Sequence, residues 1–476
     1  MKRYCYALAA GALSLVAGCK DSTLVSPTDQ PTSESLSGQL TRGGFQTLGI
    51  AVIYADRAIY AGATSAYPII GDIYARDFIR IDPSEPRWVN ETLNGQPDPG
   101  SFAGTGGWNA AYTAIRQDNT TLQALGNPAA GAFTPAELSA AKGFVHTFKA
   151  LEYYRILELR DTVGIALQGD DPNSTVPGAL ICKTKALAYI AALLDTANTE
   201  LAAGGATIPF TTLPSGFASA GGRNYGTVAN FILFNRGLKG KVDFYRALDR
   251  AAPQPTLFAT AIAELTQALG GKAPGTVPSS QFAFGPQHVF VPAGTEAQAN
   301  PYSDALLGLN PQVKDSILPG DTRRSKIDTL TAGPITGQGL TTYFRYTNSA
   351  ASTANQSRAI SLLRDEELVL LRAQAEFEAG QFANGTLDLN SVHTAYGLSA
   401  YGTFSDLQAA RSAVLYDKRY SLLGEGVQRL VDLRGYGRLN GTYFAKLLPG
   451  DPFNSALPIP KSEADARGNS LGLTCS

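Results

Sequence analysis

Apolar residues recur at helical spacing through most of this chain. Between Trp108 and Leu125, for example, Ala111, Tyr112 and Ile115 fall on one helix face. Because apolar residues placed every three or four positions bury one side of a helix, the pattern predicts a mainly all-α protein. The same spacing covers residues 45–61, 183–203, 228–250, 255–269, 359–380, 387–396 and 406–433.

One helix start is marked with particular clarity. Thr134 is followed by Pro135 and, three positions on, by Glu137. A threonine N-cap, a proline in the first turn and a glutamate that reaches back form a capping box. We therefore predict a helix from this point to about Arg160.

Residues 372–387 predict the way in which helices pair. They run from small residues through Gly380 to the aromatic Phe382. This order is typical of a tetratricopeptide unit, in which small side chains let two helices approach closely. The pattern predicts tetratricopeptide-like helical hairpins that form a scaffold, and an ordinary helical hairpin is the alternative.

Residues 271–355 differ from the rest of the chain. They are rich in Gly, Pro, Ser and Asn, with short β-prone pieces at 287–291 and 341–346. We expect a loop-rich, partly β insertion packed on the scaffold, because loops of this length are usually functional or cover a surface. The predicted organisation is one domain, 41–476, with a helical N-terminal part (41–270), the insertion (271–355) and a helical C-terminal part ending in coil (356–476).

The N-terminus resembles a bacterial lipoprotein signal. Lys2 and Arg3 precede a short apolar stretch, which ends in Val-Ala-Gly before Cys19. The stretch is too short to span a bilayer, and small residues before a cysteine suit lipoprotein processing. We predict a signal peptide at 1–18, a lipid anchor on Cys19 and a polar tether over 19–40. An ordinary secretory signal with an incidental cysteine is the alternative.

Two cysteines remain after this processing. Cys5 would leave with the signal and Cys19 would carry lipid, so Cys182 and Cys475 are left in the mature chain. An exported protein meets an oxidising compartment, which permits a disulfide. A Cys182–Cys475 bridge and two unrelated buried thiols both fit the sequence.

Composition and motifs exclude several classes of function. The chain has 39 Lys and Arg against 40 Asp and Glu, which argues against a nucleic-acid partner. Its 3 His lack the spacing of a metal site, and no P-loop or dinucleotide fingerprint occurs. Gly468–Gly472 imitates an esterase motif around Ser470, but no histidine follows it. We therefore predict a protein that is not an enzyme, with no catalytic residues, no cofactor and no metal.

Three segments together resemble a known family. They are residues 108–119, residues 362–393 and residues 417–434, and the closing Pro458-Ile-Pro with Glu463 follows them in the same order. With the lipoprotein signal and Lys20-Asp21, they resemble the SusD/RagB family of outer-membrane nutrient-uptake lipoproteins. Ser421 and Leu430 stand where that family usually has an acidic residue and Trp, so the resemblance is to a divergent member.

The resemblance implies a function. Members of the family bind glycans or peptides at the cell surface and act as the lid of a SusC-like TonB-dependent transporter. The implied protein is a lipid-anchored outer-membrane protein, facing the cell surface, that binds an oligosaccharide or peptide and passes it on. A helical-repeat scaffold that recruits other envelope proteins and an α-helical surface glycan lyase or hydrolase are the alternatives.

The segment 77–90 holds the best candidate ligand contacts. It contains a tryptophan between proline and charged residues, which suits an exposed aromatic platform, although the same ring could pin the loop to the helices. The predicted contacts are Asp77, Arg80, Arg87, Trp88, Asn90 and Tyr302. Phe290, Tyr343 and Tyr346 are secondary candidates, with local packing as their alternative role. The charges at Arg419, Glu425, Arg429 and Asp432 are expected to lock helix packing or to stay solvated, and not to take part in catalysis.

Overall fold

The structure is a computed structural model. It describes residues 39–61, 67–174, 176–210, 212–218, 222–294, 297–350, 352–468 and 474–475. The predicted signal peptide, Cys19 and nearly all of the predicted tether lie outside these ranges. Within them the chain is mainly helical, as the apolar spacing predicts.

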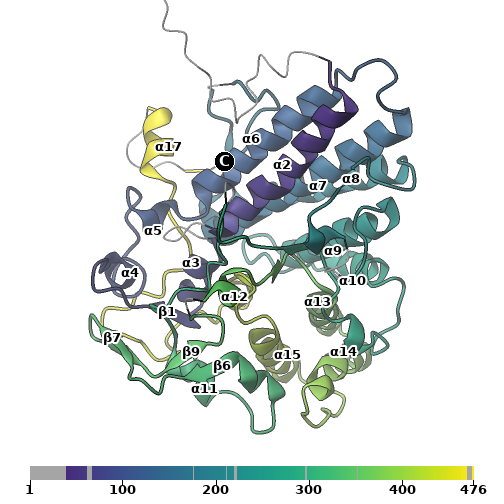
Figure 1. Ribbon diagram of the computed structural model, residues 1–476. Helices are drawn as coiled ribbons and strands as arrows, with labels where there is room; N and C mark the ends of the chain where they lie inside the picture. The colour runs from purple at the N-terminus through teal and green to yellow at the C-terminus, as the bar shows by residue number, and fades with distance from the viewer. Residues whose placement is uncertain are drawn as a thin grey trace, which may run out of the picture.

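Four pairs of helices form the body of the molecule (Figure 1). The pairs are α2 with α6, α7 with α8, α9 with α10, and α13 with α14, and successive pairs pack on one another. This is the predicted tetratricopeptide-like scaffold. The bounds are α2 (Arg42–Ala61), α6 (Trp108–Leu125), α7 (Pro135–Arg160), α8 (Lys183–Ala202), α9 (Val228–Ala247), α10 (Leu257–Ala268), α13 (Asp365–Glu378) and α14 (Phe382–Ala395).

Glycine allows α7 and α8 to pack closely. A Cβ atom on Gly143 would lie 2.7 Å from the carbonyl oxygen of Ala197 on the facing helix. Aromatic rings fill the space beside this contact, where the centroids of Phe144 and Phe231 are 4.8 Å apart. The start of α7 has the predicted capping box, in which Thr134 Oγ1 accepts from Glu137 N at 3.2 Å and Glu137 Oε2 accepts from Thr134 N at 2.8 Å.

The strands form small antiparallel pairs, and β1, β6, β7 and β9 lie together at the lower left of Figure 1. In the described residues each pair has only two strands: β1 with β5, β2 with β3, β4 with β10, β6 with β9, and β7 with β8. Phe78 lies opposite Leu309, so β1 joins the segment before α6 to the predicted insertion. The bounds are β1 (Phe78–Arg80), β2 (Ile165–Ala166), β3 (Leu180–Ile181), β4 (Gln287–His288), β5 (Leu307–Leu309), β6 (Ile327–Thr329), β7 (Ile335–Gly337), β8 (Leu340–Thr342), β9 (Phe344–Tyr346) and β10 (Ile360–Ser361).

Shorter helices connect these parts. The α-helices are α3 (Tyr67–Tyr74), α4 (Arg87–Asn90), α5 (Phe102–Thr105), α11 (Pro311–Asp315), α12 (Thr353–Gln356), α15 (Leu407–Ser421), α16 (Gln428–Gly435) and α17 (Lys461–Ala466). The 3-10 helices are η1 (Asp161–Val163), η2 (Ser215–Phe217), η3 (Ser279–Gln281) and η4 (Thr322–Lys326).

Several predicted boundaries were wrong, including that of α14, which begins at Phe382 rather than at residue 387. The helix expected over 406–433 is divided into α15 and α16, because Gly426 between them has a φ of 143° that interrupts helical geometry. The helix expected from residue 359 begins at Asp365, since residues 360–361 pair with β4 instead. The predicted C-terminal coil contains α17.

Two further features are a disulfide and the hydropathy of the described helices. Cys182, at the N-cap of α8, forms a disulfide with Cys475, which is one of the two alternatives that the sequence leaves open. Among the described helices, none combines the length and the hydropathy needed to span a membrane.

Candidate functional site

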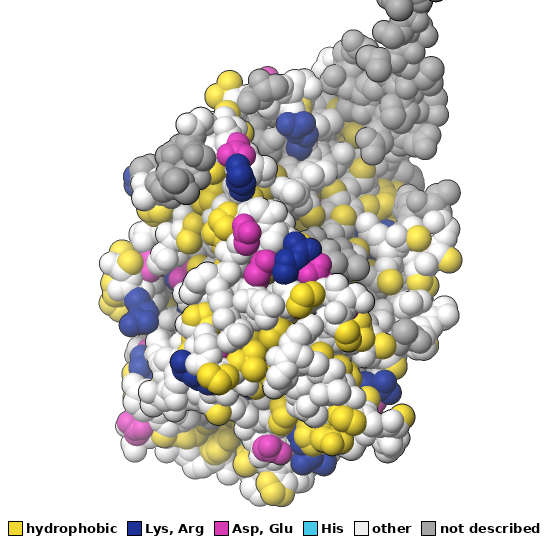
Figure 2. Space-filling model, turned by 90° about the vertical axis from the view of Figure 1, so that its left-hand side faces the viewer, with side chains coloured by type: hydrophobic (Ala, Val, Ile, Leu, Met, Phe, Trp, Pro, Cys, Tyr) yellow, Lys and Arg dark blue, Asp and Glu magenta, His cyan; other side chains and the backbone are white. Residues whose placement is uncertain are grey.

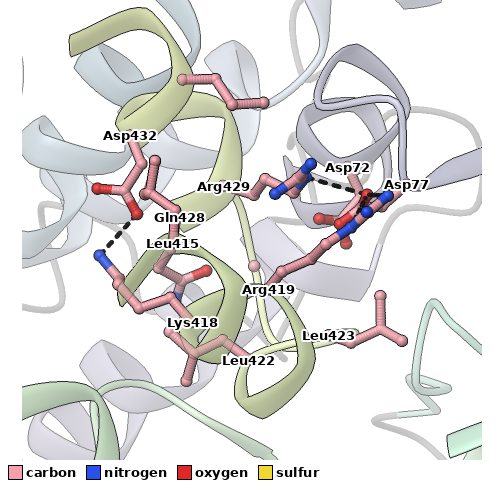
Figure 3. A pocket seen from close by; sticks show the side chains of 12 residues that line it. Asp72, Asp77, Leu415, Lys418, Arg419, Leu422, Leu423, Gln428, Arg429 and Asp432 are labelled. Atoms are coloured by element: carbon pink, nitrogen blue, oxygen red, sulfur yellow. Dashed lines mark hydrogen bonds and ion pairs between the residues drawn. The ribbon is translucent and has the colours of Figure 1, made fainter. Parts of the chain in front are cut away.

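Asp77 lies inside the protein, where two arginines surround its carboxylate (Figure 3). Arg419 Nε donates to Asp77 Oδ1 at 2.9 Å, and Arg429 Nε lies 3.0 Å from the same oxygen. The aspartate precedes β1, whereas the arginines belong to α15 and α16. This corrects the prediction that Asp77 contacts a ligand, because its burial makes it an internal ion-pair partner.

The interior around Asp77 holds further charge. Tyr302 Oη donates to Asp72 at 2.5 Å, and burial raises the pKa of that carboxyl well above its usual range. Burial, together with the charge of Arg419, lowers the pKa of Arg429 to about 10. The cavity beside these residues has a volume of about 10 Å³, which is room for about one water molecule. We conclude that the cluster joins elements rather than binding a nutrient.

Trp88 is fully buried, so the prediction of an exposed aromatic platform was wrong. Its ring lies 4.7 Å from that of Phe102, and the guanidinium of Arg80 lies over it at 4.8 Å. The reason is α4, a single helical turn that directs Trp88 inward and leaves Arg87 and Asn90 exposed. The ring therefore pins this segment to its neighbours, the alternative role considered for it.

The other predicted contacts are scattered. Tyr302 is buried, contrary to its predicted role, because its hydroxyl bonds Asp72 inside the protein. Arg80 is half-buried between two aspartates, and Arg87 is exposed but ion-paired to Glu85. Of the secondary candidates, Phe290 and Tyr346 are buried, whereas Tyr343 is 53% exposed. The structure therefore does not bring the predicted residues together at one surface site.

The surface on the loop-rich side has a mixed character. Figure 2 shows apolar side chains gathered in its lower half, and charged side chains standing singly or in small mixed-sign groups. Within the described chain, the large exposed apolar side chains include two aromatic residues, Tyr343 and Tyr443.

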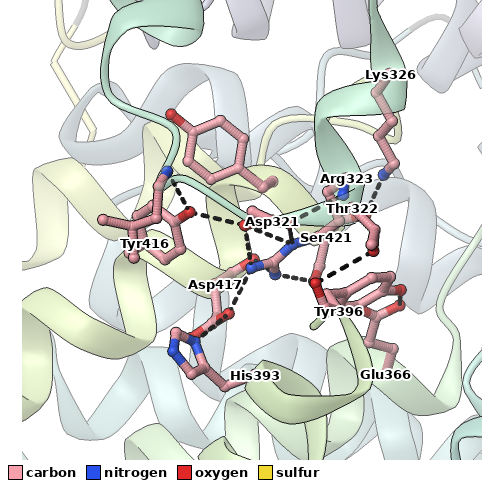
Figure 4. Close-up of polar contacts among 12 residues, drawn as sticks. Asp321, Thr322, Arg323, Lys326, Glu366, His393, Tyr396, Tyr416, Asp417 and Ser421 are labelled. Atoms are coloured by element: carbon pink, nitrogen blue, oxygen red, sulfur yellow. Dashed lines mark hydrogen bonds and ion pairs between the residues drawn. The ribbon is translucent and has the colours of Figure 1, made fainter. Parts of the chain in front are cut away.

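A second polar cluster lies around Arg323 (Figure 4). Its guanidinium bonds Asp321, Asp417 and Ser421, with Nη1 2.9 Å from Ser421 Oγ. His393 Nδ1 lies 2.9 Å from Asp417 Oδ2. Because Ser421 bonds the arginine while the histidine bonds the aspartate, these residues do not form a nucleophile–base pair. Among the described residues, no group of three or more His, Cys, Asp and Glu side chains could hold a metal ion.

A cavity of about 540 Å³ lies between α6 and α17, within the size range of small-molecule sites. It is much larger than the cavity beside Asp77. Its walls are the outer face of α6, the residues Ala166 and Gln168 at and after β2, the residues Ser174 and 176–178, and α17. The lining residues are Trp108, Asn109, Tyr112, Thr113, Arg116, Ala166, Gln168, Ser174, Val176, Pro177, Gly178, Glu463 and Ala466.

The α6 wall follows directly from helical spacing. Asn109, Thr113 and Arg116 are exposed and stand four and three residues apart, so they share one face. Tyr112 turns partly inward, and its hydroxyl bonds both the amide and the carbonyl of Ala166 at 2.8 Å. These two bonds hold β2 against α6, which makes the wall rigid.

The C-terminal wall is held by a few contacts. Lys461 N donates to Pro99 O at 2.9 Å, and Ala464 is buried against the body. Beyond α17 the chain returns to the disulfide at Cys475. Among the described lining residues Glu463 is the one carboxylate, whereas glycoside hydrolysis usually needs a pair. The arrangement therefore suits binding.

Sequence reasoning did not find this cavity. Tyr112 was expected on the buried face of its helix, and Glu463 was noted only as part of a closing motif. More than 300 residues separate the two walls, so no local spacing links them. The one signal in the sequence that pointed to this cavity was the row of polar residues on the exposed face of α6.

No family model matches this sequence, and no curated protein matches it. Solved structures do match. Surface glycan-binding protein A from Bacteroides thetaiotaomicron is 16% identical, over 91% of this chain and 98% of that chain, with a TM-score of 0.66. A SusD-like carbohydrate-binding protein from Bacteroides vulgatus is also 16% identical, over 83% of each chain, with a TM-score of 0.60.

The chain has the SusD fold. A third structure, the Bacteroides thetaiotaomicron protein in complex with laminarihexaose, matches with 15% identity and a TM-score of 0.65, over 91% of this chain and 99% of that one. The SusD fold thus accounts for the helical scaffold and for the short strand pairs packed beside it.

Proposed function

We propose that the protein is a divergent SusD/RagB member that binds an oligosaccharide at the cell surface without cleaving it. The carrying observation is the SusD fold, which extends over 91% of this chain and 98% of a surface glycan-binding protein. In this proposal the outer membrane holds the protein through lipid on Cys19. A SusC-like TonB-dependent transporter receives the nutrient, and the protein serves as its lid.

The cavity between α6 and α17 is the proposed ligand site. Its exposed Asn109, Thr113 and Arg116 can bond sugar hydroxyls, while Val176 and Pro177 offer apolar surface to sugar C–H groups. Mixed polar and apolar linings of this kind also suit peptides. An oligosaccharide is favoured because the relatives named above bind carbohydrate or glycans.

The length of the N-terminal segment supports a lid. Leu40 enters the body beside the α6–α7 connection, where its amide donates to Asn127 O at 2.9 Å. The roughly 20 residues between Cys19 and Leu40 reach at most ~70 Å when extended. A compact body of this size is roughly 55 Å across. The body could therefore swing away from a transporter while it stays anchored.

Two binding measurements test the site. Isothermal titration of the purified protein against neutral and acidic oligosaccharides and short peptides should detect a ligand. Thr113→Trp fills the cavity from the exposed face of α6 and should abolish that binding. Gln123→Trp introduces the same ring at an exposed position of α6 outside the cavity and should leave affinity unchanged.

Equal affinity of both variants would place the site elsewhere. Failure of every saccharide and peptide to bind would favour a scaffold, and new reducing ends in the titration cell would favour an enzyme.

A detergent pull-down tests the transporter role. The native lipoprotein should bring down a TonB-dependent transporter in near-equal amount by mass spectrometry. Cys19→Ser, which removes the lipid attachment site, should release the protein from the membrane fraction. Recovery of the native protein alone would contradict the lid proposal.

A further inference from the structure

Arg116 is an unpaired cation on the cavity wall. It is exposed on α6, and no hydrogen bond or ion pair to its guanidinium is found among the described residues. The nearest carboxylate along its own helix belongs to Asp118, which is buried and faces Glu152 on α7. The five N–H donors of Arg116 are therefore free for a ligand.

A second arginine lies behind the same wall. Arg160 is fully buried, and its guanidinium is 5.2 Å from the centre of the Trp108 ring, which lines the cavity. It donates to the carbonyls of Gly104 and Gly106, and no carboxylate pairs with it within the described ranges. Burial lowers its pKa to about 9, so the guanidinium stays charged at neutral pH.

Glu463, the one carboxylate among the described lining residues, is already neutralised by an arginine. Glu463 Oε1 accepts from Nε of Arg467 at 2.8 Å and from its Nη2 at 2.5 Å, and Arg467 is the C-cap residue of α17. Arg116 and Arg160 thus give the cavity an excess of positive charge. The walls are protein, so charges around the cavity act through a lower dielectric than charges on a flat surface.

We propose that this cavity selects acidic saccharides, with Arg116 binding a carboxylate of the ligand. The inference rests on the proposed function and names the substrate class of the same site. A carboxylate matches the planar fork of an arginine and can form two parallel charge-assisted bonds, which neutral hydroxyls cannot. The positive charge of Arg160 adds attraction from behind the wall without touching the ligand.

The test compares ligands that differ only in charge. Tetragalacturonate, tetramannuronate and a hyaluronan tetrasaccharide would each be titrated against the lipoprotein beside their methyl esters, with laminarihexaose as a neutral glycan. At least one acid should bind about tenfold or more tightly than its ester, as expected for a hydrogen bond to a charged group. The preference should shrink at high salt.

Variants then assign the preference to one residue. Arg116→Gln should weaken binding of the acid about tenfold and leave its ester within about twofold, while Arg116→Lys should keep part of the preference. Arg324→Gln is the matched control, because Arg324 is exposed and lies outside the cavity.

The possible failures are distinguishable. If laminarihexaose or the esters bind as well as the acids, the acidic class is overturned while glycan binding stands. If the acids bind tightly and Arg116→Gln changes nothing, the role of Arg116 is overturned. If none of the saccharides binds, the proposed function fails as well.

Discussion

Replacing Asp77 with Asn should unfold the protein more easily without altering its ligand affinity. The Asp77 side chain is 3% exposed, and three arginine nitrogens lie 2.7–3.0 Å from its Oδ1 atom. Asparagine keeps an oxygen acceptor but removes the negative charge that pairs with both Arg419 and Arg429 in the described structure. Two guanidiniums would then face each other in the interior without compensation.

The size of the effect follows from this burial. Removing one partner of a buried ion pair costs about 3–5 kcal/mol, because the remaining charge stays desolvated. For a body of roughly 440 residues the unfolding entropy is about 0.9 kcal/mol/K, so the Tm should fall by about 3–5 °C. Asp77 and Arg419 are 342 residues apart in the sequence, so the substitution would remove an ion pair that connects the segment before β1 to α15.

Thermal unfolding followed by circular dichroism would measure this shift. Glu85→Gln is the control, since it removes the partly exposed ion-pair partner of the exposed Arg87 from the same segment and should move the Tm by less than about 1 °C. A Tm for Asp77→Asn within about 1 °C of the wild type would refute the reasoning. So would loss of saccharide binding in a variant that is still folded.

Three further outcomes are expected. Trp88→Ala should lower stability by about 3–5 kcal/mol through the cavity it leaves, while titration of the folded variant shows unchanged ligand affinity; normal stability with lost binding would contradict this. The Cys182→Ser, Cys475→Ser double variant should lose about 2–5 kcal/mol, since the bridge spans 293 residues, and wild type in reductant should behave alike in denaturant unfolding. Burial, and then the charge of Asp388, raise the pKa of Glu376 from 4.5 to about 8. The folded state therefore holds an extra proton between these values, so wild-type stability should fall relative to Glu376→Gln as pH rises from 5 to 8, by up to ~1.4 kcal/mol per pH unit. Parallel pH profiles of the two proteins would argue against it.

The scaffold was largely predictable from local signals. The helix expected over 108–125 is present as α6 with the same bounds, and the Thr134 capping box marks the start of α7. Such features depend on residues within about one helical turn of each other, which lie together in the sequence as well as in space. Errors came where a distant partner intervened, as when residues 360–361 paired with β4 instead of extending α13.

The candidate site was far less predictable. Trp88 was expected at the surface because its neighbours are proline and charged residues, yet one turn of helix directs it inward. Glu463 and Asn109 line one cavity although the chain between them forms most of the protein. The polarity of a residue's sequence neighbours does not set the exposure of its side chain, because that exposure depends on which elements pack over it.

The amino-acid order alone thus specified the helical class and the positions of most helices, because periodic burial and capping act over a few residues. The likeness to the SusD/RagB family came instead from the resemblance of its motif segments. Tertiary structure decided which polar groups became internal and which surface became hollow. Asp77 is an interior ion-pair partner because Arg419 and Arg429 arrive from the other end of the chain. Arg116 lines a cavity because α17 returns beside α6. Both facts depend on where long-range packing brings the chain back upon itself.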